Sequence, residues 1–175
     1  METAADKPKK KVNGKQKGNS FERAAATLLS KRFEEYTGIE KSFRRNADSG
    51  SFWGGSNKSR VATHNTESAA FGDLICPSAF KFAVECKHYK TPPTFSSVMN
   101  TQVPQWDGWI AQSDQDSAMS GRAPLLIVKY NNVEVLAFVR DTFPSLQLRH
   151  VYKDRKVYLL SDLLTLADSE FFAAQ

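Results

Sequence analysis

The stretch GDLICPSAFKFAVECKHYK, residues 72–90, decides the fold of this chain. It predicts two short strands and the turn between them, over residues 71–76, 80–89 and 77–79. Side chains alternate between the two faces of a strand, so Glu85 and Lys87 point the same way. A hairpin turn at this place brings Asp73 roughly opposite them. The sequence therefore predicts two carboxylates and one ammonium on a single patch.

This patch suits metal-dependent hydrolysis of phosphodiesters. Mg²⁺ keeps several of its waters and takes one or two protein carboxylates together with phosphate oxygens of the substrate. Asp73 and Glu85 are sufficient anchors for such an ion. Lys87 can then position or activate the attacking water and stabilise charge in the transition state. The alternative is an ordinary sheet face on which Glu85 and Lys87 form a solvated ion pair.

Asp73 and the tripeptide Glu85-Cys86-Lys87 resemble the signature of the PD-(D/E)XK nuclease superfamily. Gly72 is a departure, because it stands where that signature has proline. The resemblance covers roughly residues 18–130 and is greatest to the Holliday junction resolvases of archaea and phages. It implies an α/β fold with a restriction-endonuclease-like core, in which helices flank a mixed central sheet. It also implies Mg²⁺ bound by Asp73, Glu85 and the Cys86 carbonyl, with Mn²⁺ able to substitute.

Glu22 lies in the first predicted helix, from residue 19 or 20 to about residue 36. Asn19 and Glu22 have the spacing of a capping box at the helix start. On a helical wheel, however, Glu22 falls on the apolar stripe with Ala25, Leu29 and Phe33. The nucleases that the chain resembles carry a glutamate in this helix that completes the metal or water shell. The resemblance therefore adds Glu22 to the catalytic residues and metal ligands.

A Gly, Ser and Asn-rich loop is predicted over residues 46–66, after a first strand over residues 39–45. Basic side chains in and before it are candidates for contact with DNA phosphates: Arg44, Arg45, Lys58 and Arg60. Archaeal resolvases resemble this in having an Arg-led loop with an active-site serine, for which Ser49 and Ser51 are the candidates. The alternative is a flexible surface loop whose aromatic residues pack on the core.

The N-terminal residues 1–18 form a basic tail. Six lysines and two acids give it a net charge of +4, which leaves about +1 for the rest of a chain with a total of +5. Such a segment is typically disordered and attracted to polyanions, which makes Lys9, Lys10 and Lys11 candidates for DNA contact. A solubilising or targeting tail is the alternative.

Residues 19–175 are expected to form a single nuclease domain, since 41% of the chain is hydrophobic. The further elements predicted are a helix over 104–113, strands over 125–130 and 133–140, a strand pair within 148–160 and a helix over 161–172. Gln102 and Gln105 are weaker candidates for the site, because the helix after this motif often contributes a polar residue in the superfamily. The three histidines show no metal-ligand spacing, and the two cysteines are interpreted as small strand residues.

No apolar run approaches the ~20 residues of a membrane span, and no secretory signal is recognisable. We therefore expect a cytoplasmic protein that works on DNA, compatible with a phage gene in a bacterial host. The predicted function is that of a Mg²⁺-dependent, structure-selective DNA endonuclease, specifically a Holliday junction resolvase. Its substrate is branched or double-stranded DNA, and the two-fold symmetry of a four-way junction favours a homodimer. The alternatives are another PD-(D/E)XK endonuclease, of restriction, repair or nicking type, and a DNA-binding protein without catalysis.

Overall fold

The computed structural model describes residues 14–46 and 71–174. The helices are α1 (Gly14–Arg32), α2 (Glu34–Thr37), α4 (Phe95–Met99), α5 (Pro104–Ser120), α6 (Leu160–Leu163) and α7 (Asp168–Phe171). The strands are β1 (Arg44–Arg45), β2 (Leu74–Ile75), β3 (Phe82–Tyr89), β4 (Ala123–Tyr130), β5 (Leu136–Val139), β6 (His150–Tyr152) and β7 (Arg155–Leu159).

The central sheet has five strands in the order β3-β4-β5-β7-β6. β3 and β4 are parallel, with α5 as the crossover between them, while the other neighbouring strands are antiparallel. The expected mixed sheet with flanking helices is thus confirmed. β3 lies at one edge of this sheet, so one side of its backbone is not paired with β4.

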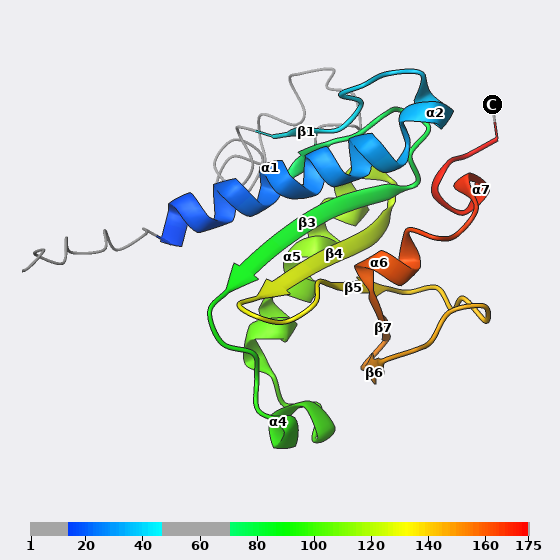
Figure 1. Cartoon of the computed structure of the whole chain (residues 1–175). Coiled ribbons are helices and arrows are strands. Elements are labelled where there is room, and N and C mark those ends of the chain that lie inside the picture. Colours follow the sequence, from blue (N-terminus) through cyan, green and yellow to red (C-terminus); the bar gives the residue numbers. More distant parts are fainter. Residues whose placement is uncertain (1–13, 47–70, 175) are drawn as a thin grey trace, which may run out of the picture.

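Two helices cover the two faces of the sheet (Figure 1). The apolar stripe of α1, which includes Ala25 and Leu29, packs on even-numbered β3 side chains such as Val84. On the opposite face, Trp106 and Ile110 of α5 pack on side chains of the other strands. These two buried clusters hold β3 between α1 and α5, so its alternating side chains point at different helices.

Salt bridges and hydrogen bonds join α5 to the hairpin of β6 and β7 at two places along the helix. Asp107 accepts from Tyr152 Oη at 3.0 Å and from Lys153 Nζ at 2.5 Å. One and a half turns before its C-terminal end, Asp114 pairs with Arg155, which is 1% exposed, and Arg155 also pairs with Asp154 at 2.5 Å. The position of α5 against the sheet is therefore fixed along most of its length.

Several predicted boundaries are wrong. α1 begins at Gly14, so residues 14–18 are helical and not part of an unfolded tail; Lys and Gln are good helix formers, and of the two glycines only Gly18 lies inside the helix. The first strand covers only β1, because Ile39 and its neighbours follow the left-handed Gly38 and stay exposed. α5 extends seven residues beyond the expected end at Ser113.

The predicted hairpin of β2 and β3 is also wrong. β2 pairs with β1 in an antiparallel two-stranded sheet, and only one bridge, of Gly72 with Val84 in the parallel sense, joins this segment to β3. Near the C-terminus, the expected helix over 161–172 is divided into α6 and α7. The antiparallel β4–β5 pair and the β6–β7 hairpin around Lys153 and Asp154 are confirmed.

The backbone conformation at position 72 explains why this chain has glycine and not proline before Asp73. Its φ is +85°, in the left-handed region, whereas proline is fixed near −65°. A Cβ atom at position 72 would also lie 2.5 Å from the Val84 carbonyl oxygen. Glycine is therefore required at this turn, where the chain reaches the edge of β3.

None of the helices in the two described segments combines the length and the apolar character that crossing a membrane requires.

We expect Gly72→Ala to lower the free energy of unfolding by about 2 kcal/mol or more, because the new Cβ both strains φ and collides with the backbone. Urea denaturation measures this. The matched control is Gly108→Ala, in the exposed middle of α5, where an added Cβ meets nothing within 4 Å. Alanine there should raise the free energy of unfolding by about 0.5–1 kcal/mol. Equal effects of the two substitutions would contradict the role of Gly72.

Candidate active site

Glu85 and Lys87 lie on the face of β3 that is turned toward α5. Their side chains form an ion pair, in which Lys87 Nζ contacts Glu85 Oε1. Lys87 Nζ also donates to the Gln112 side-chain carbonyl oxygen of α5 at 3.0 Å. The lysine is thus held between a strand carboxylate and a helix amide, with 22% of its side chain exposed.

Asp73 is held to the free edge of β3 by both its backbone and its side chain. Its N–H donates to the Val84 carbonyl at 2.8 Å. Its carboxylate Oδ2 accepts from the Cys86 backbone N–H at 2.9 Å. Asn46, which the sequence did not suggest, donates from its backbone N–H to the Asp73 carbonyl at 2.8 Å and from Nδ2 to the Gly72 carbonyl at 3.0 Å. The carboxylate is therefore placed beside the strand that carries Glu85.

The Cys86 carbonyl points to the same side as Asp73. Within a strand, the N–H and the C=O of one residue point in the same direction across the ladder. Since the Cys86 N–H reaches Asp73 rather than β4, its carbonyl oxygen also lies on the unpaired side of β3. Its thiol takes no part, since burial raises the pKa of Cys86 well above its usual value. Both cysteines are buried and free.

Glu85 is the most buried acid of the site, with an exposed fraction of 1%. Burial first, and then the nearby Asp73 carboxylate, raise the pKa of Glu85 well above its usual value, while Lys87 acts in the opposite direction. Apart from the ion pair of Oε1 with Lys87, neither carboxylate oxygen has a hydrogen-bond partner of good geometry among the described residues. A buried carboxylate left in this condition is costly. A bound cation would relieve it.

Glu22 faces the site from α1 and does not cap this helix. Asn19 and Glu22 lie within α1, more than one turn after its start, so the capping-box alternative is wrong. Glu22 Oε2 accepts from Arg45 Nε at 2.5 Å, and Arg45 Nη2 donates to Asn19 Oδ1 at 3.0 Å. Burial and the charge of Asp73 raise the pKa of Glu22 despite the hydrogen bond from Arg45.

Comparisons with known proteins bear on this arrangement. The model of the family described as "Phage putative PDDEXK endonuclease" matches residues 13–160. The chain belongs to this family of PDDEXK endonucleases. The predicted membership of the PD-(D/E)XK superfamily is therefore confirmed, and with it the restriction-endonuclease-like type of fold.

Among solved structures, Archaeoglobus fulgidus Hjc, a Holliday junction resolvase from an archaeal hyperthermophile, is similar with a TM-score of 0.39 and 16% sequence identity. The similarity covers 82% of this chain and 87% of that chain. No curated protein is similar enough in sequence to count as a match.

Two residues of α5 lie beside Glu85 and Lys87, and sequence reasoning missed both. Gln112 binds Lys87, in place of the predicted candidates Gln102 and Gln105, which precede the helix or lie in its first turn. Asp116, one turn after Gln112 on the same helix face, lies close to Glu85, and burial and the charge of Asp73 raise its pKa to about 6. The Gln-x-x-x-Asp spacing was a usable signal, but the predicted helix ended at residue 113, between Gln112 and Asp116.

The oxygen donors at the edge of β3 are compatible with a divalent ion. Among residues 14–46 and 71–174, no three His, Cys, Asp or Glu side chains converge as a ready-made metal site. Asp73 and Glu85, with the Cys86 carbonyl, nevertheless offer hard oxygen donors, and the unsatisfied Glu85 oxygens fit a cation. Two carboxylates are the number that Mg²⁺ commonly takes.

The structure does not describe the two candidates for the active-site serine or most of the predicted DNA-contact residues. Ser49, Ser51, Lys58, Arg60, Lys9, Lys10 and Lys11 lie outside the described residues. Of the remaining pair, Arg45 is bound to Glu22, whereas Arg44 is exposed. The described part of the predicted DNA contact surface therefore consists of Arg44, with Arg45 serving the site itself.

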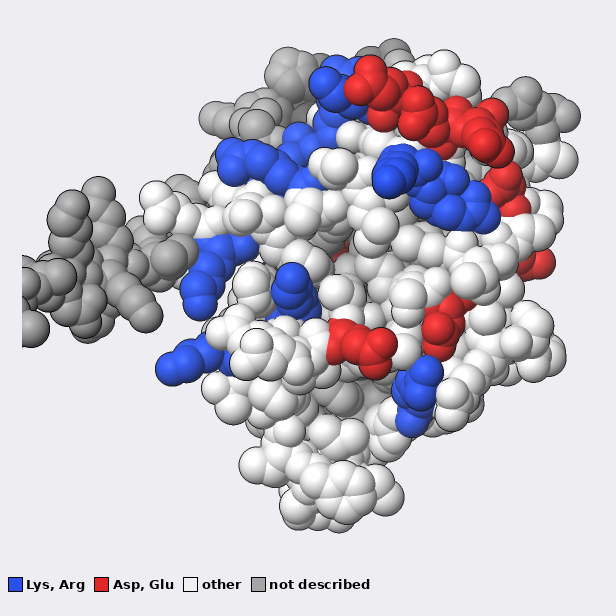
Figure 2. All heavy atoms as spheres, viewed as in Figure 1, with Lys and Arg blue, Asp and Glu red and all other residues white. Residues whose placement is uncertain are grey.

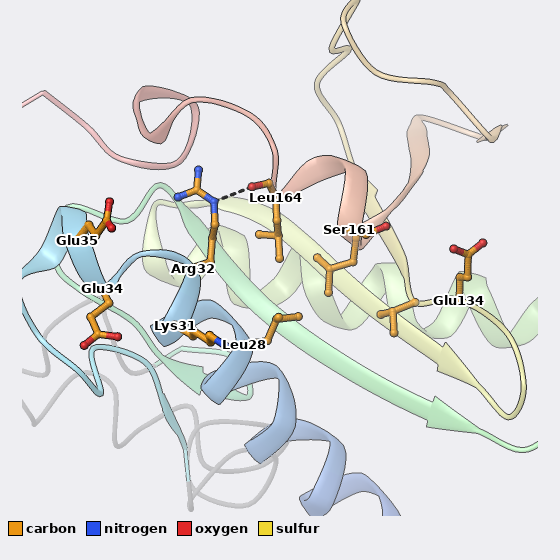
Figure 3. Close-up of a pocket in the computed structure, with 10 residues that line it drawn as sticks. Leu28, Lys31, Arg32, Glu34, Glu35, Glu134, Ser161 and Leu164 are labelled. Atoms are coloured by element: carbon orange, nitrogen blue, oxygen red, sulfur yellow. Dashed lines mark hydrogen bonds between the residues drawn. The ribbon is translucent and has the colours of Figure 1, made fainter.

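A large hollow of the described surface is separate from the site. It has a volume of about 1070 Å³ and lies between α1, α2, α6 and the start of β5 (Figure 3). Leu28, Leu160 and Leu164 give it an apolar wall, and Arg32 Nε donates to the Leu164 carbonyl at 2.6 Å. It opens on the α1 side of the sheet, whereas Glu85 and Lys87 face α5. Its size therefore carries no information about catalysis.

We expect Asp116→Asn to raise the free energy of unfolding at pH 7.5 by about 2 kcal/mol. The pKa of Asp116 is raised from 3.8 to about 6 in the folded protein. Ionisation of its carboxyl group therefore lowers the free energy of unfolding as the pH rises from about 4 to 6. The advantage of asparagine should therefore be small at pH 4 and complete above pH 6.5. Urea denaturation in EDTA at both pH values measures it, with Asp141→Asn as the exposed control. An equal difference at both pH values would contradict this assignment.

Proposed function

We propose that this PDDEXK endonuclease is a Mg²⁺-dependent DNA endonuclease that selects branched DNA and cuts four-way junctions by paired nicks. One observation carries the nuclease assignment: Asp73 is hydrogen-bonded to β3 at Cys86, between the ion-paired Glu85 and Lys87. The arrangement puts two carboxylates, a backbone carbonyl and an ammonium within one small volume at a sheet edge.

Asp73, Glu85 and the Cys86 carbonyl would hold the ion, and Glu22 would complete the surrounding shell of water ligands. Bound there, Mg²⁺ would supply charge neutralisation for the scissile phosphate and a more acidic water. Mn²⁺ has similar ligand preferences and should substitute. Glu22 is suited to a water-mediated role, because its carboxylate already accepts from Arg45.

Lys87 would orient the attacking water and stabilise the developing negative charge on the phosphate. Its ammonium has three donors, of which the Gln112 amide oxygen accepts one. With an ion held at Glu85, the ion pair of Lys87 with this carboxylate would weaken, and Lys87 would have a donor available for the substrate. Each turnover consumes one water and breaks one P–O bond of the DNA backbone.

The preference for junctions is supported by the resemblance of the motif residues to those of resolvases. A four-way junction has two-fold symmetry and requires two equivalent cuts, so we propose a homodimer with one site in each protomer. Such an enzyme would work on DNA in the cytoplasm, and in a phage-infected host cell in particular.

In the first test, a labelled four-way junction and a linear duplex of matched sequence are incubated with the full chain. With Mg²⁺ we expect paired, symmetric nicks in the junction and little cutting of the duplex, and with EDTA no cutting of either. Equal cutting of the two substrates would retain the endonuclease and overturn the junction preference. Binding without any cutting would overturn the catalytic assignment.

Asp73→Asn should reduce cleavage by about 10³-fold or more, since it removes a charged ligand at the reacting phosphate. DNA affinity in EDTA should change less than about threefold, because the phosphate contacts remain. Mg²⁺ should raise the melting temperature of the wild-type protein, as a ligand of the folded state does, and not that of the variant. Asp141→Asn, an exposed acid remote in sequence, is the control. Undiminished cleavage by Asp73→Asn would contradict the metal assignment.

A further inference from the structure

We propose that a small basic hollow between the N-terminal half of α1 and the C-terminal ends of β3 and β4 binds backbone phosphates of the DNA that flanks the cut. This inference rests on the proposed function, since it assumes a DNA substrate, and it assigns a binding role to residues outside the catalytic patch. The hollow has a volume of about 200 Å³. Its wall consists of Gln16, Lys17, Ser20, Phe21, Ala24, His88 and Lys129.

Two lysines give the hollow its charge. Lys17 is contributed by α1 and Lys129 by β4, and neither forms an ion pair with any residue in the described parts of the chain. No acidic residue lines the hollow. Most of the arginines behave differently: Arg32, Arg45, Arg140, Arg149 and Arg155 are all paired with carboxylates. Two unneutralised ammonium groups in one concavity are suited to a polyanion.

The hollow is built before any ligand arrives. His88 and Lys129 are opposite one another in the β3–β4 ladder and both face α1. The ring of His88 packs on Phe21 with centroids 5.7 Å apart, and its Nε2 lies 3.1 Å from Asn131 Oδ1. Lys129 Nζ lies 5.9 Å from the centre of the Phe21 ring. These contacts fix the floor, so little ordering remains to be done on binding.

Neutral donors accompany the lysines. The Ser20 hydroxyl and the Gln16 amide lie on the rim of the hollow. Hydroxyl, amide and ammonium groups are the usual partners of phosphate oxygens in protein–DNA contacts. The residue types of the wall therefore match a phosphodiester better than they match a base or a carboxylate-rich partner.

The location of the hollow fits DNA that continues past the cut. Phe21 of the hollow directly precedes Glu22, and His88 of the hollow directly follows Lys87. The hollow and the catalytic patch are therefore built from neighbouring residues of the chain, although the hollow faces α1 and Lys87 faces α5. In Figure 2, basic side chains lie toward the N-terminal half of α1, and the largest group of acidic side chains on this face lies near α2. A duplex arm leaving the site over this end of α1 meets the basic region.

The test is DNA binding by the full chain in EDTA, where no cutting interferes, at a series of salt concentrations. The variant is the double substitution Lys17→Ala/Lys129→Ala. Each lost phosphate contact should lower the slope of log K against log salt by about 1. We therefore expect a slope smaller by about 2 and an affinity roughly tenfold weaker near 0.1 M salt. The cleavage rate with saturating protein in Mg²⁺ should be unchanged, because neither lysine touches the reacting phosphate.

Lys31→Ala/Lys156→Ala is the matched control, since it removes two lysines that form no ion pair among the described residues. Lys31 is on the same helix as Lys17 but fourteen residues away, about 21 Å along the axis. Circular dichroism and melting temperature confirm that both variants fold. If the wild-type protein binds DNA but the two double variants have the same salt slope, the hollow has no such role while the proposed function stands. If the wild-type protein neither binds nor cuts DNA, both fall.

Discussion

The hydrogen bond from the Cys86 backbone N–H to the Asp73 carboxylate is the contact on which the site depends. It can form only because β3 is an edge strand whose N–H groups on one side are not used by β4. It also requires the chain to approach β3 closely at Gly72, where φ is +85°. The edge position of β3 and the turn at Gly72 together bring the Asp73 carboxylate close to the β3 backbone. A side chain from a complete neighbouring strand could not approach this backbone as closely.

Burial then gives this geometry its electrostatic character. Three carboxyl groups at the edge of β3, those of Glu22, Glu85 and Asp116, have raised pKa values, and in each case burial is the first cause and Asp73 the second. The two nearby cations, Arg45 and Lys87, each pair with one of these acids and leave the cluster negative. A protein optimised only for stability would replace such a cluster by apolar side chains. The Mg²⁺ ion that we propose for this site would neutralise part of this negative charge.

Sequence reasoning succeeded where the pattern was local and periodic. The alternation of side chains in residues 80–89 predicted which residues of β3 face each helix, and the apolar stripe of α1 predicted that Glu22 points inward. It failed where tertiary contacts decided the outcome. The helix over Pro104–Ser120 has several serines and acids that weaken its apolar pattern, and it persists because Asp107 and Asp114 are tied to β6 and β7. Gln112 lay inside the predicted helix but was not singled out, and Asp116 lay beyond its expected end.

The partner of β2 could not have been predicted either, and it changes how the site is supported. A hairpin would have anchored Asp73 through a ladder to β3, whereas the structure gives one bridge and pairs β2 with the two residues of β1. Arg45 of β1 binds Glu22, and Asn46, directly after it, binds the backbone of Gly72 and Asp73. The short β1–β2 sheet therefore connects the carboxylate of α1 to the carboxylate at the strand edge. Any displacement of β1 is transmitted to both acids at once, so β1 is a structural component of the site although it contributes no residue of the motif.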